Sequence, residues 1–146
     1  MRIRPLEIHD ADAILFIQRE CLEIAQWSGS DYDFSRKPEL AGWVADENHG
    51  VAGFLVSRRV ASDLEILNFA VRGDCRRKGA GSLLLRAALE WGRGFRAEKA
   101  FLEVRESNSA ALRFYEQHNF RVTGRRSRYY SAPLEDALLL ETSLSR

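Results

Sequence analysis

The feature that most constrains this chain is a turn rich in glycine and positive charge between an apolar strand and an amphipathic helix. Residues Ile66–Val71 have the character of a buried strand, and apolar side chains return at helical spacing from Leu83 onward. The start of a helix leaves about four amide groups without partners and carries roughly half a positive charge, so it favours an anion. We therefore predict a phosphate site at Arg76-Arg77-Lys78-Gly79-Ala80-Gly81-Ser82; the alternative is an ordinary solvated turn.

Length and charge restrict the kind of protein. A chain of 146 residues with 45% hydrophobic residues can bury one sizeable core, and we expect a single domain over residues 1–146. Its 22 basic and 21 acidic side chains nearly cancel, which gives no general attraction to nucleic acid or to a membrane surface. The sequence lacks an apolar signal core and any apolar stretch of the roughly 20 residues that cross a bilayer. We therefore expect a cytoplasmic location.

The cysteines and histidines are scattered along the chain. Cys21 and Cys75 form no Cys-x-x-Cys pair, and His9, His49 and His118 lie far apart in the sequence. Disulfide frameworks and metal sites draw on paired cysteines or clustered ligands. We therefore expect neither a structural disulfide nor a bound metal.

The order of the expected elements indicates an α/β (α+β) protein with a mixed sheet flanked by helices. Three successive strands favour antiparallel pairing, and the later alternation of strands and helices favours a crossover. Residues 28–39 are polar and predict a mobile connection, with a short helix after Pro38. The expected elements are a strand at 2–6, a helix that Asp10 caps and that ends by Trp27, strands at 43–45, 51–60 and 64–71 with a turn at 47–50, a helix at 82–93, a strand at 100–104, a helix at 109–117, and strands at 121–124 and 137–142.

A second set of side chains lies at and after the start of the expected helix at 109–117. Asn108 and Tyr115 are seven residues apart, which is two helical turns, so they share a face and lie about 10 Å apart along the axis. The small side chain of Ala111 between them leaves room for a ligand that meets an amide at one end and a hydroxyl at the other. The alternative is structural: Asn108 or Ser107 caps the helix and Tyr115 belongs to the core.

One carboxylate interrupts the apolar strand at 100–104. Glu103 stands in the run Ala-Phe-Leu-Glu-Val-Arg, which otherwise suits a buried strand. Desolvation raises the pKa of a carboxyl group toward the range that is useful for accepting a proton near neutral pH. Glu103 is therefore a candidate general base, and Glu65 is the rival carboxylate. The alternative for Glu103 is an ion pair with Arg105 or another arginine.

These segments together resemble the Gcn5-related N-acetyltransferase (GNAT) superfamily. Its coenzyme A signature, Gln/Arg-x-x-Gly-x-Gly/Ala after a strand, corresponds to Arg76-Arg77-Lys78-Gly79-Ala80-Gly81. The similarity is closer to the ribosomal-protein alanine N-acetyltransferases, the RimI type, in four ordered blocks at 64–71, 101–115, 125–130 and 135–140. The resemblance implies a GNAT-like fold, with a mixed, mostly antiparallel central sheet of about six to seven strands flanked by about four helices.

The resemblance also implies a reaction and a site. Such an enzyme transfers an acetyl group from acetyl-CoA to the N-terminal α-amine of a protein, such as a ribosomal protein, by direct attack and without a metal. Glu103 would be the base and Tyr115 the acid, while Tyr129 and Tyr130 would border the peptide groove from a C-terminal loop. The molecule would be a monomer or a weak dimer. The residues implied to bind acetyl-CoA are Phe69, Ala70 and Val71 through their backbone, Arg77, Lys78, Gly79, Ala80, Gly81 and Ser82 at the pyrophosphate, and Asn108.

Two departures from the family pattern leave the acceptor open. The chain reads His118-Asn119-Phe120 where the family usually has Leu-Gly-Phe, although asparagine tolerates the left-handed conformation of a helix end. Residues 28–42, which shape the acceptor site in the family, have no convincing counterpart here. A small-molecule amine is therefore an alternative acceptor, and a non-catalytic CoA-binding regulatory module is an alternative function. A nucleotide P-loop is excluded, because the turn lacks the Gly-Lys-Ser/Thr ending.

Overall fold

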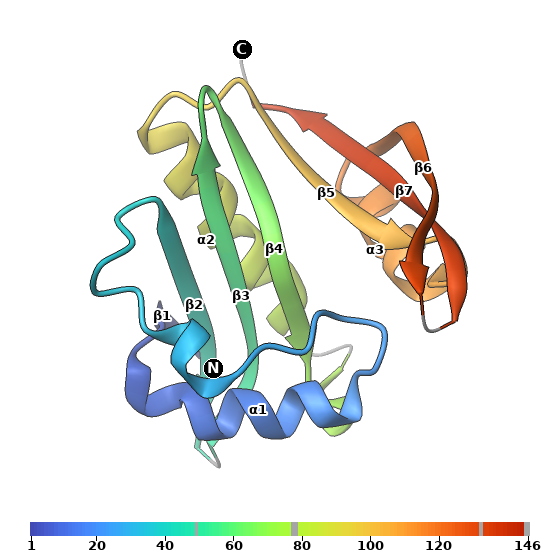
Figure 1. The fold of residues 1–146 in the computed structure, drawn as a ribbon. Helices are drawn as coiled ribbons and strands as arrows, with labels where there is room; N and C mark the ends of the chain where they lie inside the picture. The colour runs from blue at the N-terminus through green and yellow to red at the C-terminus, as the bar shows by residue number, and fades with distance from the viewer. Residues whose placement is uncertain (49, 77–78, 132, 145–146) are drawn as a thin grey trace.

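The computed structural model describes residues 1–48, 50–76, 79–131 and 133–144, and over these it contains seven strands and three α-helices (Figure 1). Short 3-10 helices lie at Ile8–Asp10, Gly29–Tyr32 and Gly73–Cys75. The main elements are β1 (Arg2–Pro5), α1 (Ala11–Glu20), β2 (Leu40–Glu47), β3 (Gly50–Val60), β4 (Asp63–Val71), α2 (Ala80–Gly94), β5 (Lys99–Arg105), α3 (Ser109–Gln117), β6 (Arg121–Ser131) and β7 (Leu134–Ser143).

The seven strands form one sheet in the order β1-β2-β3-β4-β5-β7-β6. Neighbouring strands are antiparallel except β4 and β5, which run parallel and are joined through α2. The predicted mixed, mostly antiparallel sheet is therefore confirmed, with three α-helices in the described residues where about four were expected. The short helix expected after Pro38 is wrong. Leu40 instead pairs with Arg58 and begins strand β2, so cross-strand pairing prevails over local sequence there.

The two central strands, β4 and β5, separate soon after they meet (Figure 1). Their pairing consists of Leu64 with Ala100 and Glu65 with Phe101. Against β3, the register moves from Ser57–Ile66 to Val56–Asn68, so Leu67 is the extra residue of a β-bulge. The bulge reverses the alternation of side chains. Beyond the bulge, the side chains of β4 that would have pointed to one face of the sheet therefore point to the other. This change occurs close to the point where β4 separates from β5.

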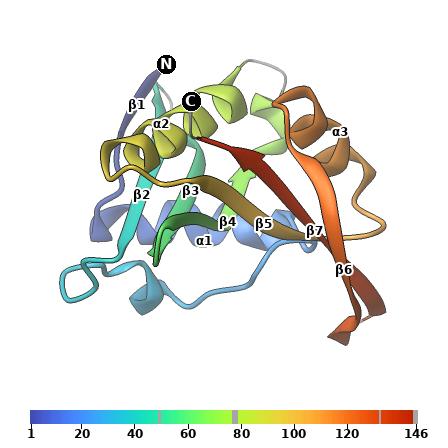
Figure 2. The same ribbon diagram turned by 90° about the horizontal axis from the view of Figure 1, so that it is seen from above.

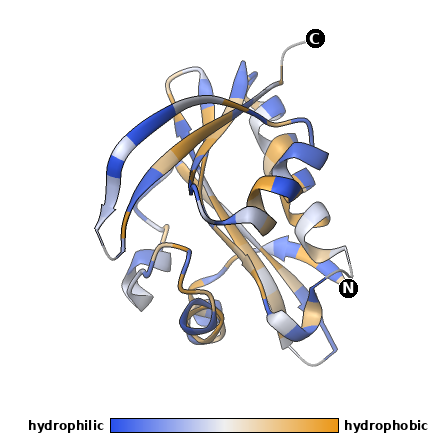
Figure 3. Ribbon diagram, turned by 90° about the vertical axis from the view of Figure 1, so that its right-hand side faces the viewer, coloured by the Kyte–Doolittle hydropathy of each residue, from blue (hydrophilic) through white to orange (hydrophobic). Residues whose placement is uncertain are grey.

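Helices cover both faces of the sheet: α1 lies on one face, and α2 and α3 lie on the other (Figure 2). Hydrophobic residues gather between the sheet and these helices (Figure 3). The cluster on the α2 face includes Leu64, Leu84 and Leu140, and that on the α1 face includes Ile14 and Phe54. Helix α2 therefore packs by its leucine side, as its periodicity predicts.

The N-terminal helix differs from its predicted form in two ways. Helix α1 ends at Glu20, before Trp27, and the chain continues into an irregular segment. Asp10 occupies the N-cap position, but its carboxylate accepts hydrogen bonds from Arg4 at 2.8 and 2.9 Å and from the backbone amide of Glu7 at 2.8 Å. Its side chain therefore joins the helix start to strand β1 and makes no capping bond to α1.

Candidate active site

The separation of β4 and β5 leaves one edge of β4 without a strand partner in the described chain. Phe69, Ala70 and Val71 pair with β3 on the other edge, whereas no register with β5 continues past Glu65. Backbone N–H and C=O groups on an unpaired strand edge are available to a ligand with its own amide groups. The prediction that these three residues present backbone to the arm of acetyl-CoA fits this geometry and stays a prediction.

The glycine turn leads directly into helix α2. Gly79 is the N-cap residue with φ of +88°, a left-handed conformation that favours glycine, and a Cβ built there would meet nothing within 4 Å. Ala80, Gly81 and Ser82 form the first turn, whose amides lack intrahelical partners. Arg77 and Lys78 lie outside the described residues. The anion site predicted from the sequence thus has suitable backbone geometry at 79–82, and its occupancy stays a prediction.

Arg76, the first residue of the signature, contacts the protein itself. Its guanidinium donates to the carbonyl of Val71 at 3.2 Å and lies 3.4 Å from the sulfur of Cys21. Burial raises the pKa of the Cys21 thiol, and the charge of Arg76 opposes that rise. Arg76 therefore connects the glycine turn to the end of helix α1.

Helix α3 places Tyr115 beside the separated part of β4. The side chain is 6% exposed, and its ring centroid lies 6.3 Å from that of Phe69 and 5.3 Å from that of Phe120. Burial alone raises its pKa above the usual value for tyrosine, with no hydrogen bond from the described residues contributing. The hydroxyl therefore keeps its proton at neutral pH, as a proton donor must.

Asn108 lies at the N-cap of α3, where its Oδ1 accepts a hydrogen bond from the amide of Ala111 at 3.2 Å. The capping role that the sequence left open is therefore present. Asn108 adjoins the start of the helix and Tyr115 lies inside it, and their sharing of one ligand-binding face stays a prediction. A contact between Asn108 and the cofactor stays a prediction and would use the side-chain NH2 group.

Glu103 projects from β5 on the face opposite Tyr115. Its neighbours Leu102 and Val104 belong to the core on the α2 face, so the alternation of the strand turns Glu103 toward the other face. The Oε1 atom lies 3.4 Å from Nε of Arg126, and Oε2 is buried without a hydrogen-bond partner in the described part of the chain. The ion pair weighed from the sequence exists, although it uses Arg126 and not Arg105.

Glu65, the rival carboxylate, is already occupied. It forms a 2.5 Å ion pair with Arg58 and belongs to the last residue pair before β4 and β5 separate. Glu103 lies beyond that point and has an unpartnered oxygen. The choice between Glu103 and Glu65 as the base stays a prediction.

Tyr129 and Tyr130 lie on strand β6, so their predicted position in a loop is wrong. Their rings are edge to face at 5.0 Å, and the Arg105 guanidinium lies 4.2 Å from the ring centroid of Tyr130. Burial and, next, the negative charge of Glu103 raise the pKa of Tyr130. Tyr130 is therefore close enough to Glu103 for their charges to interact, and a role of both tyrosines in substrate binding stays a prediction.

A buried polar cluster on the α1 face was not foreseen from the sequence. Asn68 is 3% exposed and its Nδ2 donates to the carbonyl of Ala25 and to the hydroxyl of Tyr32, both at 3.1 Å. Tyr32 also donates to Gln18 Oε1, and Gln18 Nε2 donates to the carbonyl of Trp27 at 2.9 Å. The cluster connects α1 and β4 to the irregular segment that follows α1 and contains Ala25, Trp27 and Tyr32.

The carbonyl oxygen of Asn68 is the exception within this cluster. Oδ1 is buried and has no hydrogen-bond partner in the residues that the structure describes. An unsatisfied buried polar atom costs about 1–3 kcal/mol, so such atoms are rare in folded proteins. The single polar residue in the run Ile-Leu-Asn-Phe-Ala-Val was the available sequence signal.

The family model of the acetyltransferase (GNAT) family matches residues 7–120. The chain belongs to the GNAT family. It is 27% identical over 145 residues to the ribosomal protein bS18-alanine N-acetyltransferase of Escherichia coli K12, covering 98% of this chain and 97% of that one. It is 29% identical over 156 residues to an N-alpha-acetyltransferase of Sulfurisphaera tokodaii, with 98% and 93% coverage. The predicted similarity to the ribosomal-protein-alanine enzymes is therefore confirmed, and as a GNAT protein the chain is an acetyltransferase.

Solved GNAT structures have the same fold. The crystal structure of the ribosomal-protein-S18-alanine N-acetyltransferase from Escherichia coli has a TM-score of 0.86 at 26% identity and covers 99% of this chain and 94% of that chain. Arabidopsis thaliana NAA60 in complex with acetyl-CoA has a TM-score of 0.82 at 18% identity, with 97% coverage of each chain. The second likeness concerns the fold alone; acetyl-CoA is bound in that relative's structure.

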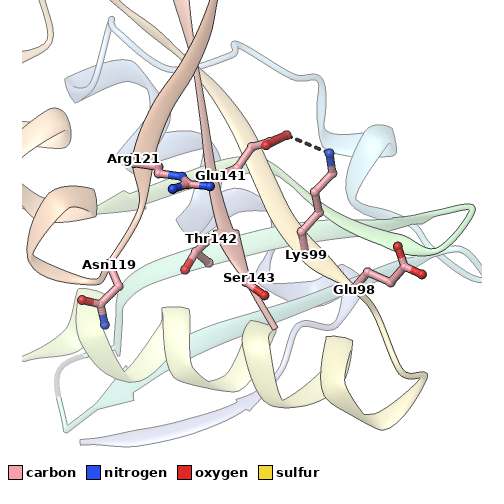
Figure 4. Close-up of a pocket in the computed structure, with 7 residues that line it drawn as sticks. All are labelled: Glu98, Lys99, Asn119, Arg121, Glu141, Thr142 and Ser143. Carbon is pink, nitrogen blue, oxygen red and sulfur yellow. Dashed lines mark hydrogen bonds and ion pairs between the residues drawn. The ribbon is translucent and has the colours of Figure 1, made fainter. Parts of the chain in front are cut away.

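Two surface hollows of this GNAT protein lie away from Glu103 and Tyr115. The larger, of about 500 Å³, is at the opposite end of β5 and β7, where Lys99 and Glu141 form a 2.8 Å ion pair (Figure 4). The smaller, of about 370 Å³, lies between α2 and the end of α3, and there Nε2 of His118 is 3.1 Å from the hydroxyl of Ser82. His118, a departure from the family pattern, thus contacts the first turn of α2.

The residues described contain no group of three or more histidine, cysteine or acidic side chains suited to hold a metal ion. Among the same residues, every helix falls short of the length and apolar character that a bilayer crossing requires.

Proposed function

We propose that this protein transfers an acetyl group from acetyl-CoA to the α-amine of a protein N-terminus, with the alanine terminus of a ribosomal protein as the acceptor type. The observation that carries the proposal is the separation of β4 and β5 with Tyr115 on one face and Glu103 on the other. Such a gap in the sheet admits a donor thioester from one side and an amine from the other. The activities of the related bacterial and archaeal enzymes, a ribosomal-protein-alanine N-acetyltransferase and an N-alpha-acetyltransferase, support the same acceptor class.

The donor would be held by backbone along its length. The unpaired edge of Phe69, Ala70 and Val71 suits the amide groups of the pantetheine arm, and the first turn of α2 at 79–82 suits the pyrophosphate. Arg77 and Lys78 would add positive charge at the same turn. A backbone amide of the Phe69–Val71 segment would stabilise the oxyanion that develops on the thioester carbonyl.

The reaction would proceed by direct attack. Glu103 accepts a proton from the α-ammonium group, directly or through water, because the ordinary pKa of that group is near 8. The free amine attacks the thioester carbonyl, so that a C–N bond forms and the C–S bond breaks. The departing thiolate of coenzyme A takes a proton from the hydroxyl of Tyr115. No covalent intermediate on the enzyme is required.

Release of the coenzyme A thiol in the presence of peptides tests this function. Peptides that begin with alanine or serine should be acetylated at the α-amine, as located by fragmentation mass spectrometry, whereas the same peptides with a blocked N-terminus should not react. Acetylation of small amines alone would refute the peptide acceptor and leave the acetyltransferase assignment standing. Tight binding of acetyl-CoA with no transfer to any amine would instead favour the non-catalytic module.

A further inference from the structure

Asn68 presents a carbonyl oxygen that the folded chain does not use. Its side-chain NH2 group donates to Ala25 and Tyr32, at 3.1 Å in each case, which fixes the orientation of the amide. The opposite atom, Oδ1, is buried and lacks a donor among the residues described. A side chain that is 3% exposed, and whose NH2 group also lies 3.5 Å from Gln18 Oε1, cannot readily turn its oxygen to solvent.

A second unpartnered oxygen lies at the same level of the sheet. Glu103 follows Phe101 by two residues on β5, and Asn68 follows Glu65 by three on β4, of which the bulged Leu67 accounts for one. Both side chains lie on the α1 face, because the bulge turns Asn68 toward the Tyr32 cluster and the alternation of β5 turns Glu103 away from the α2 core. Oε2 of Glu103 is also buried and without a partner in the described chain.

Two buried acceptors without donors, on the same face and at the same level of two neighbouring strands, suit a ligand that carries several N–H groups. A protonated primary amine has three, and its positive charge also suits the carboxylate. The two oxygens differ in chemistry, because a carboxylate can take a proton, whereas the carbonyl oxygen of an amide is far too weakly basic to do so. The amide can therefore hold the nitrogen while the carboxylate removes its proton.

We propose that Asn68 binds the acceptor amine directly, with Oδ1 accepting a hydrogen bond from one N–H of the α-amine while Glu103 takes the proton. This inference rests on the proposed function. The hydrogen bond fixes the direction of the nitrogen lone pair, so Asn68 orients the nucleophile without itself exchanging a proton. The amide in turn is held by Ala25 and Tyr32, which connects the irregular segment after α1 to the reacting nitrogen.

A cycle of two peptides and two proteins tests the contact. One peptide begins with alanine, and the other is the same peptide with a propionyl group in place of alanine, so that it lacks only the amine. Binding of each to the complex with coenzyme A is measured by calorimetry for the natural protein and for Asn68→Ala. We expect Asn68→Ala to weaken binding of the alanyl peptide about tenfold and that of the propionyl peptide less than twofold.

Two further variants distinguish a direct contact of Asn68 with the amine from a purely structural role of its side chain. Tyr32→Phe removes a partner of the Asn68 NH2 group but leaves Oδ1 in place, so it should retain the preference for the alanyl peptide. Asn68→Asp keeps an acceptor oxygen but lacks the NH2 group that Ala25 and Tyr32 hold, so it should reduce the preference for the alanyl peptide by less than Asn68→Ala does. Equal weakening of both peptides in Asn68→Ala, or loss of the preference in Tyr32→Phe, would overturn the inference.

The outcome for the natural protein keeps the two proposals apart. If it acetylates the alanyl peptide but the cycle shows no coupling with Asn68, the proposed function stands and the amine contact is wrong. If neither peptide binds at millimolar concentration and neither reacts, the peptide function is wrong and the contact with it.

Discussion

On the face covered by α2 and α3, the core is an apolar cluster, whereas on the face covered by α1 the buried set includes Gln18, Asn68 and the hydroxyl of Tyr32. The first face carries the features proposed to hold the donor, and the second carries those proposed to meet the acceptor. On the apolar face, the proposed donor site consists of backbone groups and does not depend on particular polar side chains. Buried hydrogen bonds instead fix particular side chains, which suits recognition of one amine.

The difference between the faces also appears in their tyrosines. Tyr115 lies among aromatic rings and makes no hydrogen bond in the described chain, whereas Tyr32 takes part in the polar cluster. A substitution by phenylalanine thus removes the hydroxyl of the proposed acid on one face and a hydrogen-bonded hydroxyl on the other. Paired variants can therefore test whether chemistry and recognition are divided between the faces.

Tyr115→Phe should have the largest effect on turnover. Loss of a general acid typically costs 10²–10⁴-fold in rate, so we expect kcat to fall by about that factor. The affinity for acetyl-CoA should change less than about threefold, because the hydroxyl contributes no contact to the fold. Steady-state kinetics and calorimetric titration with acetyl-CoA measure the two quantities.

Tyr32→Phe is the matched control. It should leave kcat within about tenfold and act mainly on the KM for the peptide and on stability, through its bonds to Gln18 and Asn68. If Tyr115→Phe instead acts only on acetyl-CoA binding, the acid role is wrong. If both variants lower kcat equally, the division of labour between the faces is wrong.

Asp10→Asn should have the next largest effect, on stability. The carboxylate is 3% exposed and pairs with Arg4 at 2.8 Å, and removal of one member of a buried pair costs about 3–5 kcal/mol. Although burial raises the pKa of Asp10, the hydrogen bonds from Arg4 and Glu7 outweigh it and hold the pKa below the usual value. Stability from this pair is therefore complete above about pH 4 and is lost as the pH falls through the lowered pKa.

Thermal unfolding between pH 2 and pH 7 measures this effect. Asp10→Asn should be less stable than the natural protein at neutral pH, and the difference should shrink in acid. Asp12→Asn changes an exposed carboxylate on the same helix and should be nearly neutral. Leu84→Ala, on the apolar face, should cost about 2–5 kcal/mol at every pH. A gap between Asp10→Asn and the natural protein that does not change with pH would contradict the assignment.

The face covered by α2 and α3 was the more predictable of the two from the sequence. Period-two strands, the leucine stripe of α2 and the glycine turn at 79–82 are local signals, and each appears in the structure where it was expected. The cluster of Gln18, Tyr32 and Asn68 was not readable, because its members meet only through tertiary contacts. Strand β6 was expected to end at Gly124 but runs to Ser131. The sequence did not reveal its full length, because most of its side chains are exposed and show no apolar alternation.

The residues proposed to be catalytic were only partly predictable from the sequence. Glu103 and Tyr115 were named from residue type and from resemblance, but the sequence could not show that they lie on opposite faces of a separated sheet. That arrangement follows from the bulge at Leu67 and from the short pairing of β4 with β5, which are properties of register. Arg126, the ion-pair partner of Glu103, comes from the far strand of the C-terminal hairpin and was invisible for the same reason.

Gly79→Ala should have a smaller effect, confined to the donor face. A side chain at φ of +88° costs about 1–2 kcal/mol, and relief of that strain would tilt the first amides of α2 away from a phosphate. We expect the Kd for acetyl-CoA to rise about tenfold while the KM for the peptide stays within twofold. Gly73→Ala, in the same turn but without a positive φ, is the control and should change neither quantity. Equal behaviour of the two variants would mean that the turn does not depend on the left-handed residue.

The smallest expected effect concerns alkaline pH, where kcat should not decline. Burial raises the pKa of Tyr115, so the protonated, donating form persists to higher pH than for an ordinary tyrosine, whose pKa is about 10. With an alanyl peptide, kcat/KM should rise as the α-amine loses its proton near pH 8 and then stay level to about pH 10. A decline in kcat between pH 8 and pH 10, with the protein still folded by circular dichroism, would assign the proton donor to another group. The face covered by α2 and α3 would then bind the donor but would not supply the proton.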